Sequence, residues 1–353
     1  MPPISEKFVL EQLKAVKFPG YSRDIVSFGL VKDIKVAGSD ILVRMAVATN
    51  NPSVPETLKR ESESSLRAIP GVSSVKVAID ITSPPDVSAG GQPGAATQIP
   101  GVKHVVAIAS GKGGVGKSTV AANLVAALRR SGLRVGLCDC DIYGPSISLM
   151  FGATQERPMA MNDNTIIPME RYGIKLMSMG SLLDDTSPAI LRGPMVTRAT
   201  QQFLRQTDWS RLDYLILDFP PGTGDIQLTV VQTVALSGAI VVTTPQEVAL
   251  IDVRKASSMF AKVNVPVLGI VENMSYFVCP SDGKRYDIFG SGGGKREATR
   301  LKVPFLGTIP IDIETREAGD RGMPIVLEKP ENFVAKAYLQ IATELHQKIE
   351  VEA

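Results

Sequence analysis

The feature that most constrains the fold is a glycine-rich segment that reads Gly111-Lys112-Gly113-Gly114-Val115-Gly116-Lys117-Ser118 and is followed by Thr119. It comes after a run, His104 to Ser110, that is apolar through its middle, and before a helical pattern from Lys117 to Arg130. A strand that is apolar on both faces is typical of the centre of a parallel sheet. The segment fits the G-x-x-x-x-G-K-[ST] pattern of a phosphate-binding loop, in the strand-turn-helix context that supports it.

The residue types of this segment suit a nucleoside triphosphate. Glycines let the backbone wrap closely around phosphate oxygens, so that successive N–H groups and the start of the following helix point at the anion. We expect Lys117 to reach the β- and γ-phosphates, and the Ser118 hydroxyl to coordinate Mg²⁺, which offsets the phosphate charge during transfer. The alternative, a glycine-rich turn that only joins strand to helix, is disfavoured by the flanking pattern.

The sequence after this loop alternates between strand and helix patterns. Further strands are expected at Arg134 to Cys138, Tyr214 to Leu217, Ile240 to Thr243 and Val267 to Val271. Helix-like segments lie between most of them. This alternation predicts an α/β fold with a doubly wound parallel sheet.

Carboxylates follow two of these strands. Asp139 and Asp141 come directly after the second strand, in the run Asp139-Cys140-Asp141-Ile142-Tyr143-Gly144-Pro145-Ser146, and Asp218 ends the apolar run that follows Tyr214. An isolated Asp-x-Asp is more often a turn or capping motif. Ligands of open α/β sheets, however, bind at the carboxyl ends of the strands, so we expect these side chains at the phosphate crevice. Asp218 fits a Walker B carboxylate that holds the Mg²⁺ shell.

Residues 84–100, which read PPDVSAGGQPGAATQIP, divide the chain. Their prolines, glycines and single charge can neither bury a core nor hold regular structure, so we expect a flexible linker between domains at 1–83 and 101–353. The first domain has helix patterns at Glu6 to Val16 and Pro55 to Ile69. Its strand patterns lie at Ile25 to Val31, Ile34 to Val36, Ile41 to Val47 and Val75 to Ile81. They predict a small α/β domain.

Composition argues against several functional classes. Lys and Arg number 38 against 36 Asp and Glu, a formal net charge of +2, so bulk charge does not support a nucleic-acid-binding face. The 3 cysteines cannot form a disulfide scaffold, and the start MPPISEKFVL lacks the features of a signal peptide. The apolar stretches are far shorter than the roughly 18 residues that cross a bilayer. We expect a cytoplasmic protein whose partners are neither nucleic acid nor membrane.

The run from Lys112 to Thr119 resembles the deviant Walker A loop of the SIMIBI class of P-loop NTPases, which includes MinD, ParA, the nitrogenase iron protein and the Mrp/ApbC ATPases. In that class the additional lysine, here Lys112, crosses a dimer interface to touch the nucleotide of the other subunit. The resemblance therefore implies a homodimer with two ATP molecules facing each other. It also implies that Asp141 orients and activates the attacking water, and that Asp139 supports Mg²⁺ or the switch conformation.

Four segments resemble the Mrp/ApbC family specifically: the run from Asp139 to Ser146, Arg192-Gly193-Pro194-Met195, LDYLILDFPPGTGD, and Glu272-Asn273-Met274-Ser275. The resemblance covers about residues 101–345. It implies an ATP-hydrolysing iron–sulfur cluster carrier in which Asn273 hydrogen-bonds the adenine and Gly307 to Asp312 line the base pocket. From the residues alone, an Asn at the end of a strand is equally well a turn residue.

The small domain is similar to the PaaD/SufT-type domain that often precedes this ATPase in iron–sulfur assembly factors. The likeness is carried by Ile25-Val26-Ser27-Phe28-Gly29-Leu30-Val31 and Pro70-Gly71-Val72. The chain departs from that domain in two places: Phe18-Pro19-Gly20 stands where an Asp-Pro-Glu segment is usual, and Thr49-Asn50-Asn51-Pro52 lacks the usual cysteine. We therefore expect the domain to dock partners rather than to serve a metal-linked role.

Mrp/ApbC proteins typically carry a C-P-x-C-G segment shortly after E-N-M-S, and two such pairs across the dimer give four thiolates for one bridging cluster. Here the segment reads Cys279-Pro280-Ser281-Asp282-Gly283, so one thiolate is kept and Asp282 takes the place of the other. Iron–sulfur clusters are normally held by four thiolates, but mixed ligation exists, so Cys279 and Asp282 of two copies would make a possible ligand set. The alternative is that Cys279 lies in a surface loop without a ligand role.

Three functions follow from these observations. The first is an ATP-hydrolysing homodimer that carries an iron–sulfur cluster to apoproteins and meets cluster-assembly factors. The second is an ATPase of the same fold without a cluster, which regulates proteins by binding them. The third is a positional switch of the ParA or MinD kind. The charge balance argues against the third, and so does the last helix, whose stripe of Phe333, Ala337, Ile341 and Leu345 indicates core rather than a membrane anchor.

Overall fold

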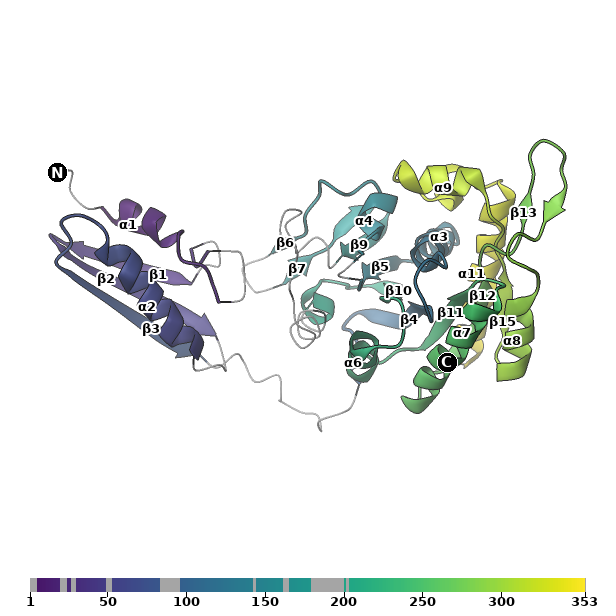
Figure 1. Cartoon of the computed structure of the whole chain (residues 1–353), viewed down its shortest axis with the longest axis horizontal. Helices are drawn as coiled ribbons and strands as arrows, with labels where there is room; N and C mark the ends of the chain where they lie inside the picture. The colour runs from purple at the N-terminus through teal and green to yellow at the C-terminus, as the bar shows by residue number, and fades with distance from the viewer. Residues whose placement is uncertain are drawn as a thin grey trace. The chain divides into compact units, whose positions relative to one another are not determined.

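The structure is a computed structural model that describes residues 5–19, 24–26, 30–48, 53–82, 96–141, 144–160, 165–178, 200 and 203–352. The chain divides into two compact units, Met1–Gln92 and Pro93–Ala353 (Figure 1). Most of the predicted linker and the whole of the segment Arg192-Gly193-Pro194-Met195 lie outside the described residues.

The first unit is a three-stranded sheet with two helices. Its elements are α1 (Glu6–Leu13), β1 (Val31–Ala37), β2 (Asp40–Ala48), α2 (Ser53–Arg67) and β3 (Ser74–Thr82). β1 pairs antiparallel with β2 through a tight turn, whereas β2 pairs parallel with β3 because α2 supplies the crossover between them. Alternate residues of β2, Ile41, Val43 and Met45, are buried against the helices. The predicted small α/β domain is confirmed.

The strand predicted at Ile25 to Val31 is wrong at its start. Ile25 and Val26 form a turn after an isolated bridge between Lys17 and Asp24, and β1 begins only at Val31. Residues 27–29 lie outside the described residues. Ile25 is nevertheless fully buried, so its apolar side chain fills the core from a turn. A local sequence pattern cannot distinguish this use of an apolar residue from a strand.

The second unit is built on an eight-stranded sheet with the order β15-β12-β11-β4-β10-β5-β9-β8. All neighbouring strands are parallel except the edge strand β8, which runs antiparallel to β9. The strands are β4 (Val102–Ala109), β5 (Val135–Asp139), β8 (Met169–Arg171), β9 (Ile174–Ser178), β10 (Leu212–Asp218), β11 (Gly238–Thr243), β12 (Val267–Glu272) and β15 (Phe305–Thr308).

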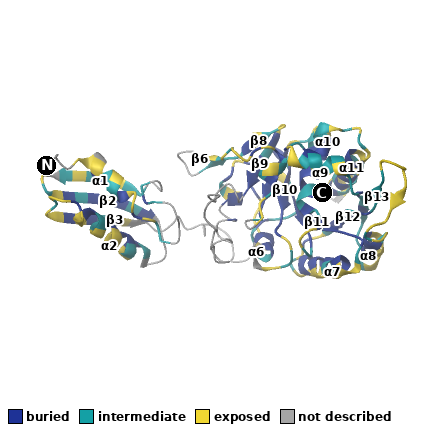
Figure 2. Ribbon diagram, turned by 45° about the horizontal axis from the view of Figure 1, so that its top comes forward, coloured by how far each residue is buried: buried dark blue, intermediate teal, exposed yellow. Residues whose placement is uncertain are grey.

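Helices cover both faces of this sheet, and Figure 2 shows the buried strands between them. One apolar core includes residues of α3, α10 and α11, and the other includes residues of α6, α7 and α8. The predicted doubly wound parallel sheet is therefore confirmed. The helices are α3 (Lys117–Arg130), α4 (Ile147–Met150), α6 (Asp225–Thr233), α7 (Glu247–Lys262), α8 (Gly293–Leu301), α9 (Ile313–Asp320), α10 (Ile325–Glu328) and α11 (Phe333–Glu352). The unit also contains two short antiparallel strand pairs, β6 (Met159–Ala160) with β7 (Ile166–Ile167) and β13 (Phe277–Val278) with β14 (Arg285–Tyr286).

The last helix packs on α3 and β15, as the sequence predicts for a core helix. Its buried stripe is Val334, Tyr338, Ile341 and Leu345, whereas Phe333, which the prediction placed in the stripe, is 48% exposed. Because Phe333 is the first residue of the helix, the core-facing stripe starts one position later than the spacing suggests. Across the described ranges, no helix combines the length and the apolarity that crossing a bilayer requires.

At the amino ends of the central strands, Asp213 joins three strands through charged hydrogen bonds. Its carboxylate accepts from the Arg134 side chain at 3.0 and 2.8 Å and from the Arg134 backbone N–H at 2.9 Å, and it lies 3.0 Å from the Lys103 ammonium. Hydrogen bonding from Arg134, more than any other cause, holds the pKa of Asp213 well below its usual range. The charged form therefore stabilises the folded unit.

We predict that Asp213→Asn lowers the free energy of unfolding at pH 7 by about 1–2 kcal/mol, since the pair is partly screened by solvent. The folded-state pKa is depressed, so this stabilisation is present above the unfolded value of about 3.9 and is lost as the pH falls toward the folded value. Urea denaturation followed by fluorescence of Trp209, a buried residue of the same unit, measures the difference. Glu331→Gln, which removes an exposed ion pair with Lys336, should change little. A pH-independent difference would show that the charge is not the cause.

Candidate functional site

The glycine-rich loop lies between the carboxyl end of β4 and the start of α3. Gly114 and Gly116 have φ angles of 81° and 79°, a left-handed backbone conformation that favours glycine. The loop is tied to its surroundings, because the Ser110 hydroxyl donates to the Lys112 carbonyl at 2.9 Å and the Gly222 N–H donates to the Ser110 carbonyl at 2.9 Å. The N-cap residue of α3 is Gly116, which has no side chain to cap the first N–H groups, so these groups can bind an anion.

A cavity of about 260 Å³ lies over this loop, and its lining includes every residue from Lys112 to Thr119 together with Asp141, Ser146 and Pro221. The structure thus brings Asp141 beside the loop, as the sequence analysis expects. The Asp141 carboxylate accepts a hydrogen bond from the Gly144 N–H at 3.2 Å. Residues 142–143 between them lie outside the described residues.

Lys117 and Asp218 form a buried ion pair at the base of the loop. The ammonium lies 2.5 Å from Asp218 Oδ1 and 3.3 Å from the Ser118 hydroxyl oxygen. The Lys117 side chain is 7% exposed and that of Asp218 is fully buried. Burial raises the pKa of Asp218, and the charge of Lys117 and hydrogen bonds from Lys117 and Ser118 oppose this rise. The Lys117 ammonium therefore contacts both groups that we expect to hold Mg²⁺, the Ser118 hydroxyl and the Asp218 carboxylate.

These groups fit a Mg²⁺ ion with its water shell. A carboxylate and a hydroxyl are hard oxygen ligands, which Mg²⁺ prefers. The second carboxylate oxygen of Asp218 is buried, and no residue that the structure describes offers it a hydrogen bond of ordinary geometry. A buried acceptor of this kind calls for a partner, which a metal-bound water would supply.

Asp139, at the end of β5, builds the turn that follows it. Its buried carboxylate accepts backbone hydrogen bonds from Asp141 at 3.0 Å, Ser146 at 2.9 Å and Ile147 at 3.2 Å. Burial, followed by the charge of Asp218, raises the pKa of Asp139 to about 7. Of the two roles expected for Asp139, the geometry suits the second, since the carboxylate shapes the segment that presents Asp141.

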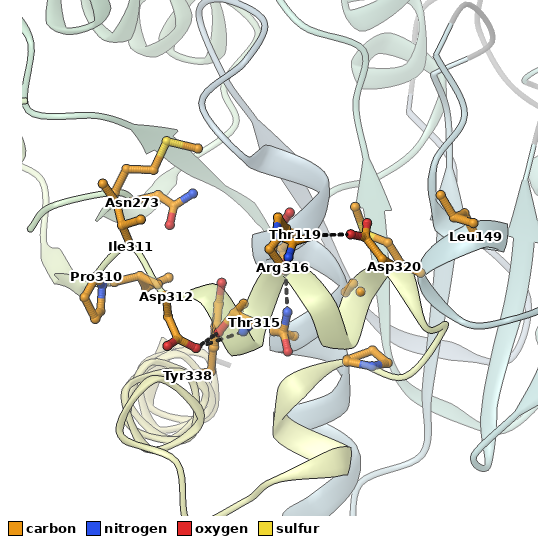
Figure 3. A pocket seen from close by; sticks show the side chains of 17 residues that line it. Thr119, Leu149, Asn273, Pro310, Ile311, Asp312, Thr315, Arg316, Asp320 and Tyr338 are labelled. Atoms are coloured by element: carbon orange, nitrogen blue, oxygen red, sulfur yellow. Dashed lines mark hydrogen bonds and ion pairs between the residues drawn. The ribbon is translucent and has the colours of Figure 1, made fainter. Parts of the chain in front are cut away.

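A second cavity, of about 290 Å³, adjoins the loop cavity and shares Thr119 and Met150 with it. Asn273 and the segment from Ile309 to Asp312 line it, whereas Gly307 and Thr308, the first residues of the predicted base-pocket segment, do not (Figure 3). The Asn273 amide donates to the Val115 carbonyl at 2.9 Å, which ties the end of β12 to the loop.

Sequence reasoning missed several residues of this region. Thr315, Arg316 and Asp320 of α9 and Tyr338 of α11 line the second cavity, but they lie far along the chain from the loop. Glu272 was named only as part of a motif. Its buried carboxylate accepts from the Ser275 hydroxyl and the Gly294 N–H, each at 2.5 Å, and so fixes the turn that carries Asn273. A charged residue at the end of an apolar strand is the signal that could have identified it.

Cys279 and Asp282 lie in the β13–β14 hairpin. The Cys279 sulfur is half-buried and lies 3.0 Å from the Ser281 hydroxyl. Asp282 closes the turn, because its carboxylate accepts from the Lys284 N–H at 2.9 Å and from the Tyr286 hydroxyl at 3.2 Å. The first of these bonds contributes most to lowering the pKa of Asp282.

No single copy gathers a complete set of metal ligands. Over the part of the chain that the structure describes, no group of three or more His, Cys, Asp or Glu side chains is placed to hold a metal ion. Cys138 and Cys140 are buried in the apolar core of the sheet, with their sulfurs 4.0 Å apart. Cys279 is therefore the cysteine that remains accessible to a second molecule.

We predict that Gly111→Ala and Gly113→Ala differ sharply, although neither glycine has a positive φ. A Cβ at Gly111 would meet Asp252 of α7 at 2.2 Å from its Cβ and 2.4 Å from its backbone, whereas a Cβ at Gly113 meets only Pro221 at 3.9 Å. Gly111→Ala should lower the free energy of unfolding by about 1–3 kcal/mol, because α7 must shift away from the loop. Gly113→Ala should stay within about 0.5 kcal/mol. Equal losses in urea denaturation would contradict the predicted clash.

Comparison with known proteins agrees with this geometry. Residues 101–346 match the family model described as NUBPL iron-transfer P-loop NTPase, and residues 6–79 match the model described as iron-sulfur cluster assembly protein. A Deinococcus radiodurans protein named iron-sulfur cluster carrier protein is 45% identical over 97% of this chain and 95% of its own length.

Solved structures support the same assignment. A nucleotide-binding protein from Archaeoglobus fulgidus, determined with ADP, is 38% identical with a TM-score of 0.58, covering 65% of this chain and 90% of its own. The cell division ATPase MinD of Pyrococcus furiosus is 25% identical with a TM-score of 0.53, covering 69% of this chain and 98% of its own. The resemblance drawn from the sequence is confirmed for both parts of the chain. Because the family model covers most of the chain and the Deinococcus radiodurans relative is similar over nearly its whole length, the chain belongs to the NUBPL iron-transfer P-loop NTPase family.

Proposed function

We propose that this protein is an ATP-hydrolysing iron–sulfur cluster carrier that works as a homodimer in the cytoplasm and hands clusters to apoproteins. The observation that carries the proposal is the phosphate loop whose lysine contacts both a hydroxyl and a buried carboxylate, in a chain that resembles named cluster carriers over nearly its whole length. ATP and Mg²⁺ are its nucleotide and metal, and the cluster is its cargo.

The residues at the loop have separate tasks in ATP hydrolysis. The N–H groups of the loop bind the phosphates, and Lys117 exchanges Asp218 for the β- and γ-phosphate oxygens when ATP enters. Ser118 and Asp218 would hold Mg²⁺, which offsets the phosphate charge and orients the γ-phosphate. Asp141, beside the loop, accepts the proton of the attacking water, while Asp139 keeps the Asp141 segment in place.

In the proposed homodimer, each copy would supply a lysine to the nucleotide site of the other. Lys112 lines the loop cavity as a second cation, and it would contact the nucleotide of the other subunit across the interface. Such a contact is possible only when two loops face each other, so ATP binding would control the geometry of the dimer. The cavity that contains Asn273 and Ile309 to Asp312 would hold the adenine.

The cargo site would lie between two copies of the β13–β14 hairpin. Two Cys279 thiolates would then bind one cluster. Asp282 of each copy stands where the C-P-x-C-G motif has its second cysteine, so its carboxylate is the other candidate ligand in this segment. In the hairpin both Asp282 oxygens already accept hydrogen bonds, so ligation by Asp282 would require the turn to open. The N-terminal unit, which matches an iron–sulfur assembly domain, would dock assembly factors or recipient apoproteins.

A second candidate function is a protein-binding regulator that hydrolyses ATP without carrying a cluster. The engagement of Asp282 within its own hairpin favours it, since each copy then offers a single thiolate. A positional switch on DNA or membrane has no comparable observation in its favour.

For ATP hydrolysis, we predict that Ser118→Ala lowers the rate at least about 100-fold, because the Mg²⁺ complex loses a ligand in the transition state. Lys117→Ala should abolish hydrolysis. Ser131→Ala is a matched control, since Ser131 ends the same helix and its hydroxyl bonds only the Ala127 carbonyl at 3.1 Å. The measurement is phosphate release at varied Mg²⁺. Normal hydrolysis by Ser118→Ala would contradict the proposed metal site.

For the cargo, we predict that the anaerobic protein supplied with iron and sulfide binds about one cluster per dimer, and that Cys279→Ser binds none. Labile sulfide and bound iron measure the cluster. Asp282→Asn is assayed beside Cys279→Ser. If thiolates alone hold the cluster, Asp282→Asn still binds it; if Cys279 and Asp282 both serve as ligands, neither variant binds it. Absence of a cluster in a protein that hydrolyses ATP normally would leave the regulator as its function.

A further inference from the structure

A buried hydroxyl near the second cavity has no hydrogen-bond partner among the residues that the structure describes. The Tyr338 hydroxyl, on α11, forms no hydrogen bond with any residue in the described ranges, although its side chain is only 1% exposed. Burial raises the pKa of this phenol further above neutrality, so it is a protonated donor. Native proteins rarely leave such a group unpaired, because burying it without a partner costs free energy.

Tyr338 is one of the residues that line the second cavity, and its hydroxyl oxygen is buried at the edge of that cavity. Figure 3 shows Tyr338 extending from α11 toward the pocket, beside Asp312 and Thr315. Thr119 and Met150 line both this cavity and the phosphate-loop cavity, so the two cavities are neighbours. A nucleotide with its phosphates at the loop would place its base in the second cavity.

The polar side chains near Tyr338 in the cavity lining form their hydrogen bonds with other groups. Asp312 accepts from the Thr315 N–H at 2.8 Å and from the Thr315 hydroxyl at 2.7 Å. Asn123 donates to the Thr119 carbonyl at 3.0 Å and accepts from the Val326 N–H at 3.3 Å. At the mouth, Arg316 pairs with Asp320 at 2.7 Å. None of these bonds uses the Tyr338 hydroxyl, so a molecule in the cavity would supply the partner that it lacks.

We propose that the Tyr338 hydroxyl donates a hydrogen bond to the purine base of the bound nucleotide and is a base-recognition residue of this protein. The inference rests on the proposed ATP-binding function. A purine ring offers nitrogen acceptors at its edge, and its faces suit the apolar side chains of Leu149 and Ile311 in the same cavity. Inorganic triphosphate has no base and therefore offers this donor no ring nitrogen.

The test compares Tyr338→Phe with wild type in the full-length protein. Removing a hydroxyl that is unpaired in the free protein should leave its thermal stability unchanged or slightly higher, since no native hydrogen bond is lost. The dissociation constant for Mg²⁺–ATP, measured by calorimetry, should rise about three- to tenfold. The dissociation constant for inorganic triphosphate, which has no base, should not change. A loss confined to ATP is the result expected from base recognition.

Tyr214→Phe is the matched control. The Tyr214 hydroxyl also faces α11, but it is paired with His346 Nδ1 at 2.9 Å, so its removal should lower stability and leave ATP affinity unchanged. Equal ATP affinity in Tyr338→Phe and wild type would overturn the inference. So would a parallel loss of ATP and triphosphate binding with lowered stability, which would assign Tyr338 a structural role. If wild type binds triphosphate and ATP equally well, the base has no site here; if it binds neither, the proposed function itself fails.

Discussion

The contact between the Lys117 ammonium and the Asp218 carboxylate holds together the start of α3 and the end of β10, and the rest of the site is arranged around it. Both groups are buried, so loss of either would leave an uncompensated charge in the core, which is strongly destabilising. The pair is also the place where the free protein and the nucleotide complex must differ. A phosphate at the loop would compete with Asp218 for the Lys117 ammonium, and a carboxylate that Lys117 released would be available to the metal.

Two other buried carboxylates at the same edge of the sheet have a different role. Asp139 accepts three backbone N–H groups after β5, and Glu272 accepts the Gly294 N–H and the Ser275 hydroxyl after β12. In each case a side chain at the end of a strand replaces water as the partner of a turn, so the turn has one well-defined shape. One turn presents Asp141 to the phosphate loop, and the other presents Asn273 to the second cavity. Asp139 and Glu272 therefore act by positioning Asp141 and Asn273.

The tip of the β13–β14 hairpin is organised by short-range contacts, while its base bridges Ile311 through Phe277. Asp282 closes its turn, Arg285 pairs with Asp287 at 2.8 Å, and the Arg285 guanidinium lies 4.1 Å from the centre of the Tyr276 ring. These contacts keep Cys279 at an accessible position without using core residues. The hairpin therefore can present a thiolate to a second molecule, but a full set of cluster ligands depends on what that molecule supplies.

The sequence by itself determined the features that depend on neighbouring residues. The glycine-rich pattern predicted a phosphate-binding loop, and the apolar runs predicted the central strands. The position of Asp218 at the end of such a run placed it at the carboxyl edge of the sheet. The sequence pattern placed Ile25 in a strand and Phe333 in the buried stripe of the last helix. The structure instead places Ile25 in a turn and leaves Phe333 exposed, because contacts with distant elements decide which side chains are buried. The tertiary structure alone brought Tyr338 and α9 to the nucleotide side of α3, and turned Glu272 inward as a turn-building carboxylate. Such long-range proximity follows from strand order and helix packing, which a pattern read along a single chain does not specify.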